Sequence, residues 1–149
     1  MSNFKWGPRS LTNMYGIHPD LRTVMNHALS VSTVDMSVIE GLRSEERQRK
    51  LVAQGKSQTM KSRHLTGHAV DVVPWVNGQI TWDWAFYYPM ADAIMKAAKS
   101  TNIPIRWGGN WHVKDIRSWD GTAEELAKDY PGSFSDGPHF ELTWGDYPL

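Results

Sequence analysis

The chain has 149 residues, no cysteine, and 16 lysines and arginines balanced by 16 aspartates and glutamates. That length suits one domain with its own core, so we expect residues 1–149 to form a single unit. The zero net charge argues against a nucleic-acid or anionic-membrane binder, and the lack of cysteine leaves only histidines and carboxylates as metal ligands.

The first half of the chain alternates helical and strand patterns. A proline in the first turn, followed by apolar residues at helical spacing, predicts a helix at 19–30. The alternation in TVDMSVIEG predicts a strand at 33–41. Ser44 resembles an N-cap and predicts a helix at 45–54. The β-branched segment AVDVVPW predicts a strand at 69–75.

The second half is less regular. The alanine-rich segment 89–100 predicts a helix that begins at its proline, because proline is tolerated only in the first turn. Short strands are predicted at 103–107 and 139–144. The stretch 108–137 is rich in Gly, Asp, Ser and Trp, which favours loop with one short helix near 122–129. These elements predict an α+β fold.

The chain shows no export or membrane signal. Its first residues lack a charged region followed by an apolar one, and no apolar run approaches the roughly 18 residues of a spanning helix. We therefore expect synthesis in the cytoplasm without a signal peptide and no membrane insertion.

Histidines and an aspartate gather in SRHLTGHAVD, residues 62–71. Gly67 and the β-branched run that follows argue against a helix here and favour a turn between two extended pieces. Such a turn can bring His64 and Asp71 to one point, and imidazole with carboxylate is part of a normal zinc ligand set. A catalytic zinc still needs a third protein ligand from elsewhere.

Five other histidines compete for that place. His18 resembles a helix entry, and His27 lies on the polar side of its predicted helix. His112 and His139 each follow a loop and adjoin an aromatic residue. Asp136 precedes His139 by three residues, where a carboxylate can take a proton from a metal-activated water. This spacing favours His139 over His112.

Four blocks of the sequence together resemble one family. SRHLTGHAVD matches the Ser-x-His-x-x-Gly-x-Ala-x-Asp signature of the M15 zinc peptidases, and DGPHFEL resembles their acid-x-x-His block. IEGLRS, with Arg43, resembles their Gly-x-Arg-Ser segment. IRWGGNW resembles the Arg-Trp-Gly-Gly-Asp-Trp of the phage-type branch. Order and spacing agree over roughly residues 35–144, which makes the resemblance specific.

The resemblance implies a Hedgehog- and D,D-peptidase-like domain with a short antiparallel sheet flanked by helices. It also implies one Zn²⁺ per chain, a general base, and an arginine that holds a substrate carboxylate or the developing oxyanion. The residues implied are His64, Asp71 and His139 as metal ligands, Asp136 as base and Arg43 as the arginine.

Further residues are predicted to bind substrate or to support the ligands. They are Ser62, His68, Trp107 and Trp111, with His68 expected on the cleft wall or behind a ligand rather than on the metal. The chain departs from the family pattern at two positions. Asp136 stands where many relatives have glutamate, and Asn110 replaces the aspartate of the phage-type block.

The implied substrate is a peptidoglycan stem peptide that contains D-residues. The chain looks most like the L-alanyl-D-glutamate endopeptidases that serve phages as endolysins, and we expect a monomer that reaches the periplasm or cell wall after release. One alternative is a D,D-carboxypeptidase or D-alanyl-D-alanine dipeptidase of the same family. Another is a non-catalytic wall-binding zinc module, which would not need the proton acceptor Asp136.

Overall fold

The computed structural model describes residues 2–57 and 59–148. Within these residues the strands form one antiparallel sheet in the order β1-β2-β5-β4, and β3 pairs with β2 off this path. This arrangement confirms the predicted α+β class. The elements in chain order are α1 (Pro8–Met14), α2 (Pro19–Val31), β1 (Asp35–Glu40), α3 (Glu45–Ala53), the 3₁₀ helix η1 (Arg63–Thr66), β2 (Ala69–Val76), β3 (Gln79–Ile80), α4 (Trp84–Thr101), β4 (Ile105–Trp107), the 3₁₀ helix η2 (Ile116–Ser118), α5 (Ala123–Lys128) and β5 (His139–Leu142).

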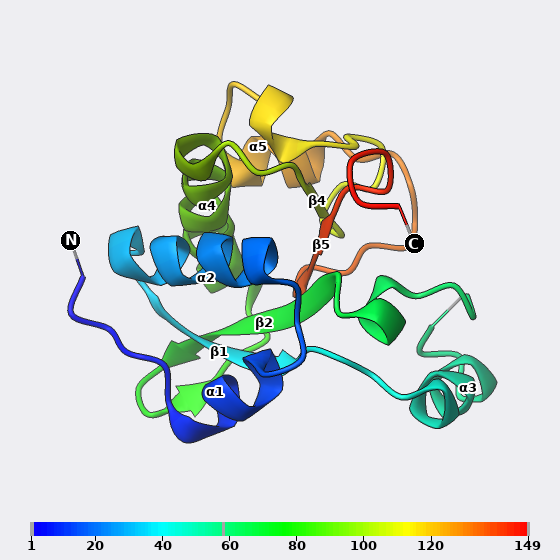
Figure 1. Ribbon diagram of the computed structural model, residues 1–149. Helices are drawn as coiled ribbons and strands as arrows, with labels where there is room; N and C mark the ends of the chain where they lie inside the picture. The colour runs from blue at the N-terminus through cyan, green and yellow to red at the C-terminus, as the bar shows by residue number, and fades with distance from the viewer. Residues whose placement is uncertain (1, 58, 149) are drawn as a thin grey trace.

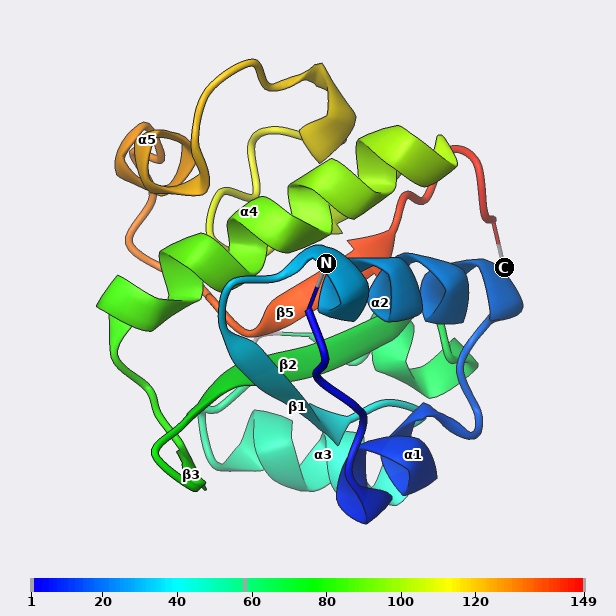
Figure 2. The ribbon, with the colours of Figure 1, turned by 90° about the vertical axis from the view of Figure 1, so that its left-hand side faces the viewer.

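One face of the sheet packs on the apolar core, and the other face carries polar side chains. Helices α2 and α4 pack together over one face, and α1 and α3 lie on the other side of the sheet (Figure 1 and Figure 2). Successive strand residues point to opposite faces. Phe140 and Leu142 of β5 are therefore fully buried in the core with the helices, whereas His139 and Glu141, which alternate with them along the strand, line a cavity on the other face.

Helix α4 corrects one prediction. It begins at Trp84 rather than Pro89, with Asp83 as N-cap accepting the backbone N–H of Ala85 at 2.9 Å, so Pro89 lies inside the helix. A proline there forfeits one backbone hydrogen bond. Aromatic packing offsets the loss, because Trp84 meets Tyr87 edge-to-face with ring centroids 5.2 Å apart.

Four elements were not predicted: helix α1, strand β3 and the 3₁₀ helices η1 and η2. Helix α1 starts with a proline but has no side-chain cap, so it lacks the usual start signal. Strand β3 follows a two-residue turn of Asn77 and Gly78, which both have positive φ, 54° and 79°. Asn-Gly is the strongest short hairpin signal, but the two-residue strand after it is too short to show a period.

No helix among the described residues is long and apolar enough to cross a membrane.

Candidate metal centre and catalytic cleft

The segment before β2 positions His64. It forms the one-turn 3₁₀ helix η1 rather than an α-helix, and Ser62 caps it by accepting the backbone N–H of His64 at 3.2 Å. Gly67 ends the turn with a φ of 76°, and a Cβ there would lie 2.5 Å from the backbone oxygen of Gly16. Only glycine fits this corner, after which the chain enters β2.

Three predicted ligands converge where β2 and β5 meet. Asp71 and His139 are direct partners in the antiparallel register. Oδ1 of Asp71 lies 3.1 Å from Nε2 of His64 and 3.4 Å from Nδ1 of His139. One ligand atom from each residue falls within 4.8 Å of the others, so this group has the geometry to hold a metal ion. Both imidazoles are buried, and Asp71 is partly exposed to the cavity.

The outer hydrogen bonds of the two imidazoles set their tautomers. Nδ1 of His64 lies 2.8 Å from the carbonyl oxygen of Gly41, which can only accept, so this nitrogen carries the proton. Nε2 of His139 donates in the same way to Oε1 of Glu141 at 2.7 Å. Both remaining nitrogens therefore direct lone pairs at the Asp71 carboxylate, an arrangement that a proton or a cation must neutralise. A zinc ion fits this donor set, with a carboxylate and a carbonyl behind its imidazoles.

The pKa values of Asp71 and His139 also indicate that the carboxylate is stabilised by positive charge beside it. Burial by itself raises the pKa of Asp71, but the adjacent imidazoles outweigh burial and hold that pKa far below its usual range. Burial lowers the pKa of His139, whereas its hydrogen bonds to Asp71 and Glu141 raise it to about 10. Without a metal, the centre therefore retains a proton that a metal would displace.

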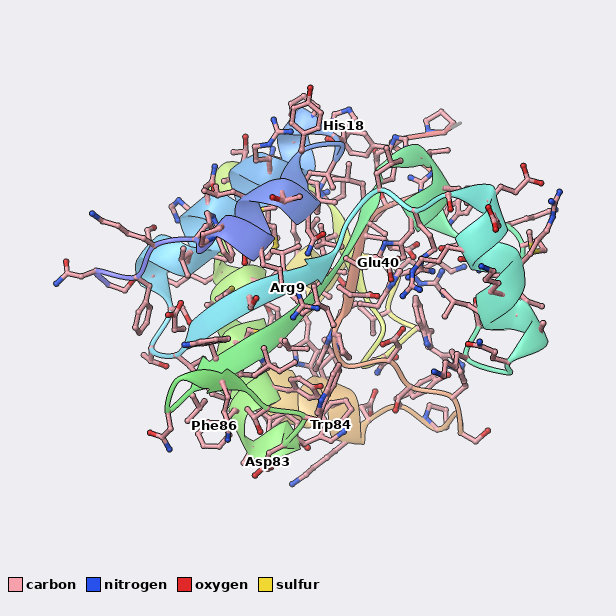
Figure 3. All side chains as sticks on the ribbon, turned by 90° about the horizontal axis from the view of Figure 1, so that it is seen from below. Arg9, His18, Glu40, Asp83, Trp84 and Phe86 are labelled. Atoms are coloured by element: carbon pink, nitrogen blue, oxygen red, sulfur yellow. The ribbon has the colours of Figure 1, made fainter. Side chains whose placement is uncertain are left out.

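Arg43 is buried beside this centre. Its Nη2 donates to Glu40 at 2.7 Å and reaches Oδ2 of Asp71 at 3.4 Å, and its Nη1 donates to Gln48 at 2.7 Å. Glu40 lies at the end of β1, close to the segment that leads into α3 (Figure 3). Arg43 thus binds the oxygen of Asp71 that faces away from the histidines, which leaves Oδ1 for a metal.

Asp136 lies on the wall of the same cavity. Its backbone N–H donates to Gly108 at 2.8 Å, and its carbonyl accepts the N–H of His139 at 3.1 Å, so Asp136 and His139 share one tight loop. Burial and the charge of Asp71 raise the pKa of Asp136, while the neighbouring histidines and Arg43 lower it in part. A raised pKa suits a carboxylate that must accept a proton.

The cavity around the centre has a volume of about 910 Å³. Of the predicted supporting residues, Ser62 and Trp111 line it, and the Trp111 ring lies 5.1 Å from the ring of His139. Trp107 does not line the cavity, because it is a core residue whose Nε1 donates to Gly137 at 2.7 Å. It therefore supports the loop of Asp136 from behind.

His68 lies away from the cavity. Its Nδ1 bonds to Thr66 at 2.6 Å, and its ring lies 5.5 Å from the ring of His18. In Figure 3, His18 is well separated from Glu40 at the cleft. The period of β2 explains this placement, because His68 precedes the strand and faces away from Asp71. His68 is not among the residues that line the cavity.

The rival third ligand, His112, lines the cavity but lies outside the ligand group. Its ring packs edge-to-face on Tyr130 at 5.2 Å.

Asn110, one of the two departures from the family pattern, is buried and stabilises the surrounding loop. Its Nδ2 donates to Leu126 at 2.9 Å and its Oδ1 accepts the N–H of His112 at 3.0 Å. An aspartate could not make the first of these bonds.

Two carboxylates of the site, Glu40 and Glu141, are not among the predicted site residues. Glu141 is 4% exposed, holds His139, and has an Oε2 with no partner within the described residues. The signal for it was present, because residues two apart on a strand share a face and His139 was already a candidate. Glu40 gave no such signal, since its partner Arg43 follows a bend in the chain.

The antiparallel sheet and its His64–Asp71–His139 group define the class of the protein as an α+β domain with a candidate metal centre at a large cavity. Comparison with known proteins narrows this class. The family described as phage L-alanyl-D-glutamate peptidase matches residues 1–143, and the chain belongs to that family.

Individual relatives agree with this membership. The L-alanyl-D-glutamate peptidase of Escherichia phage T5 is 32% identical over 145 residues, which cover 95% of this chain and 99% of the relative. The peptidase of the same name from Listeria phage A118 is 29% identical over 143 residues, which cover 93% of this chain and 42% of that protein. The crystal structure of the Serratia marcescens L-Ala D-Glu endopeptidase ChiX matches with a TM-score of 0.79 and 42% identity, over 99% of this chain and 96% of that one.

Proposed function

We propose that the protein is a zinc-dependent peptidase that hydrolyses the L-Ala–D-Glu bond of peptidoglycan stem peptides and serves a phage as an endolysin. One observation carries the proposal. In a member of the L-alanyl-D-glutamate peptidase family, His64 and His139 both direct a ring nitrogen at one oxygen of Asp71, at the wall of a large cavity.

The roles of the residues follow from their positions. His64, Asp71 and His139 hold the ion, which when bound polarises the peptide carbonyl and lowers the pKa of a water to about 7. Asp136 accepts the proton of the attacking water and passes it to the leaving amine. The buried guanidinium of Arg43 stabilises the negative charge that develops on the carbonyl oxygen.

Metal content and activity together test the centre. We expect His64→Ala, Asp71→Ala and His139→Ala each to lose zinc, measured by elemental analysis of the purified proteins. His112→Ala is the matched control, since His112 lines the same cavity outside the ligand group, and it should keep zinc. If His139→Ala keeps zinc and His112→Ala loses it, the third ligand is His112 and not His139. Wall digestion that survives exhaustive chelation would refute the zinc dependence.

Mass spectrometry of digested muropeptides tests the bond. Cleavage at L-Ala–D-Glu releases peptides whose new amino terminus is D-glutamate. Release of D-alanine or of D-alanyl-D-alanine would instead point to a D,D-carboxypeptidase or a dipeptidase. If no new amino groups appear, the chain is a wall-binding module and the proposal is wrong.

We further propose that the chain acts as a single peptidase domain and as a monomer at the cell wall. Light scattering of the active protein tests the oligomeric state, and a stable dimer would contradict it.

A further inference from the structure

The cavity concentrates positive charge in a chain that is neutral as a whole. Six of the 16 basic residues line it, against four of the 16 acidic ones. A bound zinc ion would add further positive charge, so the cavity suits an anionic ligand. The six are Arg43, Arg47, Lys56, Lys61, Arg63 and Arg106.

Five of these six side chains either have partners within the protein already or are flexible lysines. Arg43 and Arg47 both pair with Glu40, at 2.7 and 2.6 Å. Arg63 is buried and donates to backbone carbonyls, at 2.7 Å in the case of Tyr147. The two lysines are exposed point charges on flexible stems, which gives them little geometric selectivity.

Arg63 also packs on an aromatic ring, that of Trp144, and its Nε and Nη1 have no partner within the described residues, but it is only 2% exposed. Arg106 differs from Arg63 in being partly exposed, and from Arg43 and Arg47 in lacking an ion pair within the described residues. Its Nε and Nη2 donate to the carbonyl oxygen of Trp111 at 3.0 and 2.6 Å, and its Cζ lies 5.1 Å from the centre of the Trp111 ring. The guanidinium is therefore fixed on one side by a carbonyl and an aromatic ring. No ion pair of Arg106 and no hydrogen bond of its Nη1 occurs within residues 2–57 and 59–148. Three of its five N–H groups remain, and they form a fork that matches a carboxylate.

Arg106 is also close to the metal centre. The Trp111 ring that packs on Arg106 lies 5.1 Å from the ring of His139. In the sheet, Arg106 of β4 is the cross-strand partner of Glu141 of β5, which holds His139. Both side chains line the cavity. The Trp111 ring therefore lies near both the guanidinium of Arg106 and the ring of His139.

We propose that Arg106, braced by Trp111, is the subsite for the free α-carboxylate of the D-glutamate that follows the scissile bond. This inference rests on the proposed function. In a stem peptide the D-glutamate continues through its γ-carboxyl, so its α-carboxylate stays free unless it is amidated. That carboxylate is attached to the Cα of the residue directly after the scissile bond. The two Cα atoms on either side of a peptide bond are about 3.8 Å apart, so the carboxylate must bind close to the scissile bond. Arg106 thus distinguishes D-glutamate from D-isoglutamine, whose α-carboxyl is a neutral amide.

Two synthetic stem peptides that differ only in this group test the subsite. One carries D-glutamate and the other D-isoglutamine, and kcat/KM is measured for both with the zinc-loaded enzyme. We expect the wild-type enzyme to prefer the acid. We expect Arg106→Gln to lose roughly 10- to 100-fold on the acid, the effect of one charge-assisted hydrogen bond, with little change on the amide. Arg106→Lys keeps the charge without the fork and should retain part of the preference.

The ratio of the two kcat/KM values within one protein does not depend on how much of a variant is folded, so it survives a loss of stability. Lys56→Gln is the matched control, because it removes one positive charge from the same cavity and should leave the ratio unchanged. Calorimetric binding of product peptides that begin with D-glutamate or D-isoglutamine gives a second readout, in which Arg106→Gln should weaken only the acid.

The outcomes separate the subsite from the proposed function. Equal losses on both peptides in Arg106→Gln, or a wild-type enzyme that cuts both equally well, overturn the subsite and leave the proposed function standing. Cleavage of neither peptide by the zinc-loaded wild type overturns the proposed function and the subsite with it.

Discussion

Replacing Glu141 by alanine removes the carboxylate that holds His139. In the structure Oε1 of Glu141 accepts from Nε2 of His139 at 2.7 Å, and the side chain is 4% exposed, so water does not readily take its place. The hydrogen bond keeps the proton on Nε2 and presents Nδ1 to the metal. Losing such a partner costs about 10- to 100-fold in metal affinity. Glu141→Gln keeps an acceptor oxygen but loses the charge, so its loss should be smaller.

Competition with a chromophoric chelator measures the zinc affinity of both variants, and thermal unfolding of the metal-free proteins checks that they fold. Glu124→Ala is the control, since Glu124 pairs with Lys128 on the exposed surface of α5 and should bind zinc like the wild type. If a folded Glu141→Ala binds zinc as tightly as the wild type while His139→Ala does not bind it, Glu141 does not support His139 as a metal ligand.

Three further predictions concern the base, the pH dependence and the turn. Asp136→Asn should keep zinc but lower turnover about 10²- to 10⁴-fold in a muropeptide assay; loss of zinc would contradict this. Hydrogen bonds to Asp71 and Glu141 overcome burial and raise the pKa of His139 from 6.5 to about 10 in the metal-free protein. The resulting stabilisation is complete below pH 6.5 and is lost as the pH rises toward 10, so Tm should fall across that range, but not in His139→Gln. Gly67→Ala should lower the free energy of unfolding, measured in urea, by more than the about 1–2 kcal/mol expected for Gly78→Ala. Both glycines have positive φ, but only at Gly67 would a Cβ meet another backbone atom; equal losses would contradict this.

Local patterns predicted most of the secondary structure. Ser44 caps α3 as its sequence indicated, by accepting the N–H of Arg47 at 3.1 Å. Helix α4 begins at Trp84, five residues before the predicted start at Pro89, because the proline rule does not take the aromatic packing of Trp84 into account. The Trp84 ring also lies 6.3 Å from the ring of Trp107, and packing between residues so far apart in the sequence has no local signal.

The candidate site was predicted in part. The types and spacing of the residues and their family resemblance named His64, Asp71, His139 and Asp136, which the structure brings to one cavity. His68 lies elsewhere, beside the ring of His18, because an odd number of positions separates it from Asp71 and the two side chains therefore face opposite sides.

The sequence by itself determined the side chains available for chemistry and the face on which each strand presents them. A strand alternates with period two, so His139 and Glu141 share a face whatever surrounds them. Only the tertiary structure decided which residues meet across strands. The antiparallel register sets Asp71 against His139 and Arg106 against Glu141, and this register depends on the packing of the whole sheet on α2 and α4. A shift of one residue would turn these side chains into the core, so the buried face fixes the register and with it the metal centre and the Arg106 subsite.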